Sequence, residues 1–227
     1  MKSNSMKQIL SIAFTVFMIA FLPLISGQGI LKAQDSKAKA MLDEVSSKVK
    51  SYDNIYIDFK YSLSNEAQGV NQETRGDVTL EGDKYKLNLM GTTQLYDGKQ
   101  LHTIVPEDEE ITISTQSPDD DDAITPSKML TFFNKGYTYK WDIDQNVNGR
   151  KIQYIKLIPI DSNSEIKQAL LGVDAQTKNI YKLIMTQNNG TKIAITVNSF
   201  KTDQPMPDAM FVFDENKYAD YYINRLD

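Results

Sequence analysis

Apolar residues recur at every second position through much of this chain beyond residue 53. The segment 54–63 is the clearest case, because Ile55, Ile57 and Phe59 alternate with mostly polar neighbours. An alternation of period two is typical of a β-strand with one buried face. Turn sequences such as Asp97-Gly98 separate the later segments at hairpin spacing. The pattern therefore predicts a mainly β fold, a curved antiparallel sheet of about eleven strands covered by a few short helices.

The expected strands are alternating or short apolar segments bounded by turn residues. No internal repeat and no low-complexity linker follows residue 33, so a single domain is expected there. The tail 214–227 is predicted to form a turn of helix and a terminal strand. The strands are expected at 54–63, 74–80, 85–89, 95–96, 101–105, 109–114, 137–143, 151–159, 168–174, 180–186, 191–200 and, short and late, 211–213.

Two helices are available to cover one face of this sheet. An apolar stripe with helical spacing runs over 38–49, after Asp35 and Ser36 as candidate caps. Thr125-Pro126 is predicted to begin a short second helix that Gly136 ends. A large curved sheet under two helices leaves an apolar cavity, which is a natural binding site for a greasy ligand. The alternative is that the same residues simply pack as core.

The first 33 residues have the layout of a secretory signal peptide. Lys2 and Lys7 precede an apolar run over 9–25, and Ala33 offers a small residue for cleavage. The alternative is an uncleaved anchor helix, although Pro23 and the short run weigh against it. We expect residues 1–33 to be removed and residues 34–227 to act in a bacterial periplasm. Cleavage removes three lysines and no acids, so the net charge of −5 becomes −8.

The composition excludes several kinds of chemistry. Without cysteine the chain has no disulfide, thiol nucleophile or lipidated N-terminal cysteine, and its single histidine rules out a multi-histidine metal site. His102 is expected to be an exposed or half-buried strand residue, and the acidic run 119–122 lacks the alternation of a calcium loop. No hydrolase or nucleotide-binding motif is present. We therefore expect no enzyme, cofactor, metal or nucleic-acid partner.

A series of short motifs follows one order along residues 34–227. The motifs are the helix 38–49, the strand 55–63, Gly76-Asp77-Val78-Thr79-Leu80, Tyr96-Asp97-Gly98, the turn at Pro106, Thr125-Pro126, the strand 155–159 and the late Phe211-Val212-Phe213-Asp214. Their order resembles the periplasmic outer-membrane lipoprotein carrier family, LolA-type, and in particular its Bacteroidetes-type branch. The resemblance covers nearly all of residues 34–227, and it depends on order and spacing more than on any single motif.

The resemblance implies an incomplete antiparallel barrel closed by a helical lid. Its partners would be acylated lipoproteins or lipids, an inner-membrane ABC lipoprotein exporter and an outer-membrane acceptor, and the protein is expected to be a monomer. One alternative is a lipid-binding or envelope-stress sensor module with a different ligand, and another is an envelope hydrolase. The family's Lys-Arg-Pro segment, whose Arg holds the lid shut, is replaced here by Glu81-Gly82-Asp83.

The candidate ligand-binding residues are the apolar side chains expected on one face of the first strands and on the two helices. A slip of one residue in strand register would turn each set to the other face. The candidates are Met41, Ile55, Ile57, Phe59, Tyr61, Leu63, Val78, Leu80, Tyr85, Leu87, Leu89, Met129, Phe132 and Phe133.

Overall fold

The structure is a computed structural model that describes residues 28–115 and 125–226. The chain divides into two compact units, 1–34 and 35–227, and the second contains every described strand. The apolar run of the predicted signal peptide and the acidic run 119–122 lie outside the described residues. No helix among the described residues is long and apolar enough to cross a membrane.

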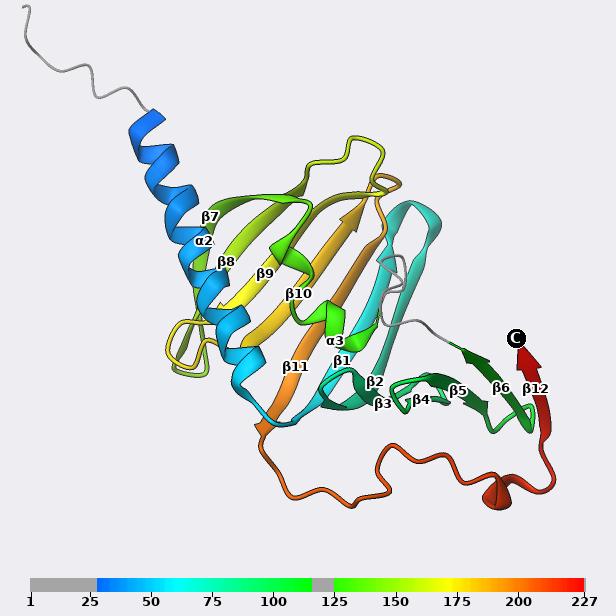
Figure 1. The fold of residues 1–227 in the computed structure, drawn as a ribbon. Coiled ribbons are helices and arrows are strands. Elements are labelled where there is room, and N and C mark those ends of the chain that lie inside the picture. The colour runs from blue at the N-terminus through cyan, green and yellow to red at the C-terminus, as the bar shows by residue number, and fades with distance from the viewer. Residues whose placement is uncertain (1–27, 116–124, 227) are drawn as a thin grey trace, which may run out of the picture. The chain divides into compact units, whose positions relative to one another are not determined.

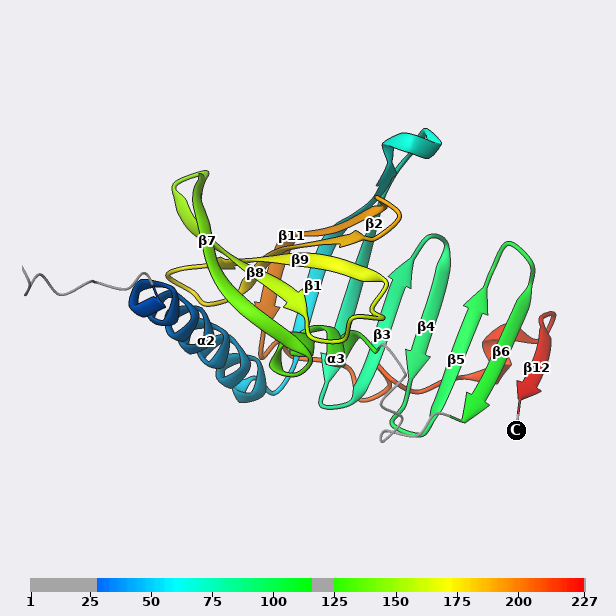
Figure 2. The same cartoon turned by 90° about the horizontal axis from the view of Figure 1, so that it is seen from above.

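The second unit is built on one open, curved sheet in the order β12-β6-β5-β4-β3-β2-β1-β11-β10-β9-β8-β7 (Figures 1 and 2). All neighbouring strands are antiparallel except β12 and β6, which run parallel. The strands are β1 (Ile55–Asn65), β2 (Val70–Glu81), β3 (Lys84–Leu89), β4 (Thr92–Tyr96), β5 (Gln100–Val105), β6 (Glu110–Thr115), β7 (Tyr137–Val147), β8 (Arg150–Pro159), β9 (Ile166–Asp174), β10 (Ile180–Gln187), β11 (Lys192–Thr202) and β12 (Tyr222–Leu226).

The predicted mainly β architecture is confirmed, with three corrections. The sheet has twelve strands among the described residues, not eleven, and it is mixed because of β12. Residues 211–213 form no strand; a turn ends at Phe211, and Phe213 packs its ring on the sheet instead. The sheet is open, as expected for an incomplete barrel, since β7 and β12 are its two edges and do not pair with each other.

The first helix, α2 (Gln28–Ser51), is longer than predicted, so Asp35 and Ser36 lie inside it and do not cap it. The second predicted helix is divided into α3 (Pro126–Met129) and the 3-10 turn η2 (Phe132–Asn134). Its predicted start is correct, because Thr125 Oγ1 accepts a hydrogen bond from the backbone N–H of Lys128 at 3.2 Å. Two further 3-10 turns, η1 (Glu66–Gln68) and η3 (Glu215–Tyr218), lie between strands.

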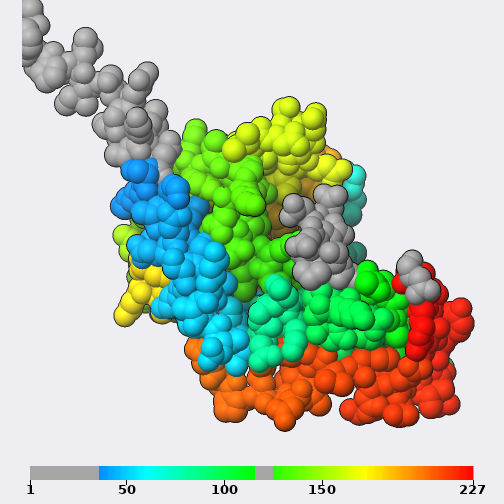
Figure 3. All heavy atoms as spheres, viewed as in Figure 1, coloured from blue at the N-terminus to red at the C-terminus, as the bar shows by residue number. Residues whose placement is uncertain are grey.

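Two apolar clusters lie on opposite faces of the sheet. The main core fills the face that α2 and α3 cover, and it includes Ala38 and Val45 of the helix together with Ile155 and Leu157 of β8. The smaller cluster centres on Ile111 and lies under the C-terminal tail. The tail, 203–221, runs beside β3 to β6, as the orange and red spheres of Figure 3 show, and η3 and β12 at its end confirm the predicted helical turn and terminal strand.

Candidate functional site: an apolar cavity under the helices

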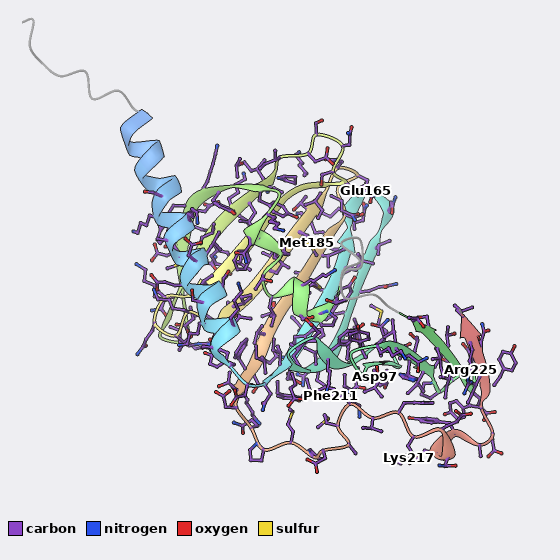
Figure 4. All side chains as sticks on the ribbon, in the orientation of Figure 1. Asp97, Glu165, Met185, Phe211, Lys217 and Arg225 are labelled. Atoms are coloured by element: carbon purple, nitrogen blue, oxygen red, sulfur yellow. The ribbon has the colours of Figure 1, made fainter. Side chains whose placement is uncertain are left out.

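A cavity of about 270 Å³ lies between the helix-covered face of the sheet and α3. Sixteen of the described residues line it, and none of these sixteen carries a charge. The side chains at one end include Met185 of β10, which Figure 4 labels. The lining residues are Ile57, Phe59, Tyr61, Val78, Leu87, Leu89, Pro126, Met129, Leu130, Leu171, Ile180, Leu183, Met185, Ile193, Ile195 and Val197.

Strand pairing explains why these residues face one space. Ile57 pairs with Val78 of β2, and Tyr61 pairs with Ile195 of β11, so alternate residues of three adjacent strands point to the same side. Phe59 lies opposite Gly76, where an added Cβ would come within 2.7 Å of Phe59 Cζ and of the Asn88 carbonyl oxygen. The missing side chain at Gly76 therefore makes room for the Phe59 ring on the cavity wall.

The segment that covers the cavity is anchored away from the cavity itself. Phe133 of η2 is fully buried in the main core, and its carbonyl oxygen accepts a hydrogen bond from Tyr139 Oη at 2.8 Å. Ser46 of α2 donates to Asn134 Oδ1 at 2.8 Å. This cover is therefore held by β7 and α2. The Glu81-Gly82-Asp83 turn between β2 and β3 places Gly82 in the left-handed region at φ 57°.

The structure brings half of the candidate residues together at the cavity. Ile55 and Leu80 line a neighbouring pocket of about 320 Å³, and Leu63 is half-buried on β1 outside the cavity lining. Met41, Tyr85 and Phe133 are buried in the main core, while Phe132 packs against that core. The candidates that line the cavity are Ile57, Phe59, Tyr61, Val78, Leu87, Leu89 and Met129.

Sequence reasoning missed the wall formed by the later strands. Ile193, Ile195 and Val197 alternate as clearly as the first strand does, so their shared face was visible. Their place beside β1 was not visible, because the β1–β11 pairing joins residues about 140 positions apart. Pro126 and Leu130 were noted only as parts of a helix. The missed lining residues are Pro126, Leu130, Leu171, Ile180, Leu183, Met185, Ile193, Ile195 and Val197.

Among the residues that the structure describes, Tyr61 is the one cavity-lining residue with a polar side-chain group. Burial raises the pKa of Tyr137, and it raises the pKa of Tyr85 to about 12, so both phenols stay protonated at neutral pH. His102 is buried, whereas an exposed or half-buried position was expected, and its ring stacks on Phe213 with centroids 4.4 Å apart. Within 36–115 and 125–226, no three potential metal-ligating side chains come together. The arrangement suits the burial of an uncharged, apolar ligand.

Comparison with known proteins gives a family match over most of the chain. The family model described as outer membrane lipoprotein carrier protein LolA matches residues 50–214. No curated protein matches the sequence.

Several solved structures are similar to this chain at low sequence identity. An uncharacterized conserved protein from Thermus thermophilus has a TM-score of 0.53 at 10% identity, over 84% of this chain and 99% of that one. Lipoprotein LppX from Mycobacterium tuberculosis has a TM-score of 0.46 at 12% identity, over 74% and 98%. A LolA superfamily protein from Nitrosomonas europaea has a TM-score of 0.41 at 13% identity, over 78% and 97%. At these identities the T. thermophilus structure supports the fold alone.

Proposed function

This chain belongs to the LolA family of outer membrane lipoprotein carrier proteins, and on that premise we propose that it shields the acyl chains of lipoproteins in its cavity. In this role it carries them through the periplasm, from an inner-membrane ABC exporter to an outer-membrane acceptor. It acts as a binding protein without catalysis. Residues 1–33 serve as a cleaved signal peptide that exports residues 34–227.

The uncharged lining of the cavity is the observation that supports this proposal. Moving apolar surface out of water contributes about 0.8 kcal/mol per methylene, so a cavity wall made of aliphatic and aromatic side chains holds an acyl chain without specific polar contacts. A substrate that is turned over needs placed acids, bases or electrophiles, and no charged side chain within 28–115 and 125–226 lines this space. The cavity residues of β1, β2, β3, α3 and β9 to β11 are the proposed ligand contacts.

Native mass spectrometry of the protein purified from periplasm tests the proposal directly. We expect it to co-purify with acylated lipid or lipoprotein, and depletion of the protein should cause lipoproteins to accumulate at the inner membrane. If no acyl-bearing molecule co-purifies and depletion leaves lipoprotein sorting unchanged, the carrier role is wrong.

A pair of variants on one strand separates binding from folding. Ile195 lines the cavity, whereas Thr196 follows it on β11 and points to the other face of the sheet. Ile195→Asp places a carboxylate in the cavity wall and should remove the co-purifying ligand. Thr196→Asp, equally half-buried, should keep it. Loss of ligand in both variants would point to a folding defect and not to the cavity.

A further inference from the structure

The helix-covered face of the sheet continues beyond the cavity. Strand pairing places Ile57, Val78 and Leu87 side by side on β1, β2 and β3, and all three line the cavity. The same row of paired residues runs on across the next four strands, where it becomes polar at the step from Leu87 to Gln94. The members of this polar row are Gln94 of β4, Thr103 of β5, Thr112 of β6 and Asn224 of β12.

The polar row lies on the face opposite the C-terminal tail. Alternate residues of the same strands, such as His102, Ile104 and Ile111, are buried on the tail side. The four side chains of the polar row are half-buried, and Figure 2 shows their strands extending beyond α3. Within 36–115 and 125–226 none of these four side chains makes a hydrogen bond. Their donors and acceptors are therefore available to a ligand that leaves the cavity along this face.

The charge on this face disfavours an anionic ligand. Glu110 lies two residues before Thr112 on β6, so it points the same way as the polar row. The basic side chains of the neighbouring strands are engaged elsewhere: Lys86 lines the pocket under the tail, and Arg225 donates to Glu215 at 2.7 Å. A phosphate placed on the polar row would therefore meet a carboxylate, and no lysine or arginine of β3 to β6 or β12 faces it there.

The length of the polar row matches an extended peptide. Neighbouring strands lie about 4.8 Å apart, so four side chains on four strands span about 14 Å. An extended chain rises about 3.3 Å per residue, so about four residues of a peptide cover the row. Hydroxyl and amide side chains both donate and accept hydrogen bonds, and so does each peptide unit. The polar row can therefore satisfy an uncharged peptide whose attached acyl chains lie in the cavity.

We propose that the polar row binds the first few residues of the peptide that carries the acyl chains. The ligand of this face is then an uncharged lipopeptide and not a phospholipid. Its acyl chains lie against the apolar part of the row at Ile57, Val78 and Leu87, and its peptide continues from Gln94 toward Asn224. The proposal rests on the proposed function, because it assigns the polar part of the same ligand.

Two ligands with identical acyl chains test the polar row. One is dipalmitoylglyceryl-cysteine amide, and the other carries the uncharged tetrapeptide Ser-Ser-Asn-Gly after the same cysteine. Displacement of a fluorescent apolar probe from delipidated protein gives both affinities. The wild-type protein should bind the peptide-bearing ligand at least about tenfold more tightly, since each neutral hydrogen bond contributes about fivefold. Equal affinities would overturn the polar row alone, whereas no binding of either ligand would mean that the proposed function fails as well.

Two threonine variants locate the peptide preference. Thr103→Val and Thr112→Val each remove one hydroxyl from the polar row and keep the shape of the side chain. Each should reduce the preference for the peptide-bearing ligand about fivefold and leave the affinity for the peptide-free ligand unchanged. Thr196→Val, on the other face of β11 and equally half-buried, is the matched control and should keep the wild-type preference. If the two row variants weaken both ligands alike, the threonines act through packing and the proposal is wrong.

Dipalmitoyl phosphatidylglycerol separates peptide recognition from binding of any polar head group. The wild-type protein should bind this lipid more weakly than the peptide-free ligand, because Glu110 repels its phosphate. Glu110→Gln should recover part of that loss and leave the preference for the tetrapeptide in place. Tighter binding of phosphatidylglycerol than of the lipopeptide would overturn the peptide assignment in favour of a phospholipid. Far-UV circular dichroism checks that each variant is folded.

Discussion

Two regions of the single sheet are covered by different parts of the chain, one by helices and the other by the C-terminal tail. Strands β1 to β3 and β8 to β11 bury the face under α2 and α3, whereas β5 and β6 bury the opposite face under the C-terminal tail. The change of face falls on β4, where Leu95 and its neighbour Tyr96 point to opposite sides and are both nearly inaccessible. The helices leave a cavity whose described lining residues are all uncharged. The tail leaves a pocket of about 200 Å³ whose lining includes Lys86, Asp214 and Lys217.

The comparison shows what produces a binding cavity in this fold. The tail lays aromatic rings directly on the strands, with Phe213 between His102 at 4.4 Å and Tyr218 at 5.5 Å between ring centroids. The four-residue helix α3 cannot fill the width of the curved sheet in the same way. An apolar space therefore remains where the cover is short, and packed aromatic contacts form where the cover follows the strands.

The largest expected effect on stability comes from comparing a residue in the packed core of the helix-covered face with a residue that borders the cavity. Leu157 is fully buried away from the cavity, and Leu157→Ala should destabilise the protein by about 2–5 kcal/mol. Leu87 is half-buried and borders the cavity, so Leu87→Ala should cost only about 1 kcal/mol, since fewer contacts are lost. Urea denaturation measures both values, and equal losses would mean that the cavity wall is packed as tightly as the core.

The second prediction tests whether the two covered regions are independent. Phe213→Ala removes the ring stacked between His102 and Tyr218 and should lower stability by about 2 kcal/mol. Affinity for an acyl ligand should stay at the wild-type value, because the ring lies in the tail-covered cluster and not at the cavity. A drop in affinity at temperatures where the variant is fully folded would show that the tail and cavity are coupled.

A third comparison uses two glycines on opposite faces. An added Cβ at Gly76 would meet the Phe59 ring and a backbone oxygen at 2.7 Å, and one at Gly172 would meet the Tyr154 ring at 2.9 Å. Each alanine substitution should cost about 1–3 kcal/mol through overpacking. Only Gly76→Ala should also weaken acyl binding, because it pushes Phe59 toward the cavity. Equal affinities in the two variants would remove Phe59 from the list of ligand contacts.

The smallest effect on stability at neutral pH is expected for a substitution at Tyr85. Its ring lies in the main core, with its centroid 5.6 Å from the ring centroid of Tyr96. Burial raises its pKa from 10.0 to about 12, so the folded state favours the protonated phenol. This contribution to stability is complete below pH 10 and is lost as the pH rises from 10 through 12.

Tyr85→Phe isolates the contribution that the raised pKa of Tyr85 makes to stability. The variant should lose stability less steeply between pH 10 and 12, by up to about 1 kcal/mol per pH unit. Denaturation midpoints measured across that range check the slope, with the half-buried Tyr181→Phe as the matched control. Parallel curves for wild type and Tyr85→Phe would contradict the buried, protonated state.

Much of the fold could be predicted from local pattern. The alternation at Ile55, Ile57 and Phe59 gave the correct inward face of β1, and Thr125-Pro126 marked the start of α3. The Asp97-Gly98 turn correctly joined β4 to β5. These features depend on neighbouring residues, so the sequence contains all the information that determines them.

The remaining features depend on contacts between distant segments. The alternation of β5 did not reveal that His102 and Ile104 face the tail, because that face is buried only by residues 203–221. The parallel addition of β12 to β6 and the pairing of β1 with β11 have no local signal. The seven cavity-lining residues of β9 to β11 were missed for the same reason.

The β1–β11 pairing also affects when the cavity can form. Ile57 lies beside Phe200, so the central hydrogen-bonded ladder of the sheet joins the beginning of the domain to its end. Contacts of such long sequence separation form slowly, because a long loop must close before they contribute stability. The cavity walls from β1 and β11 meet only after nearly the whole polypeptide is available. A chain that is still emerging can form the β1 to β6 hairpins, but it cannot yet hold a ligand between the two halves of this sheet.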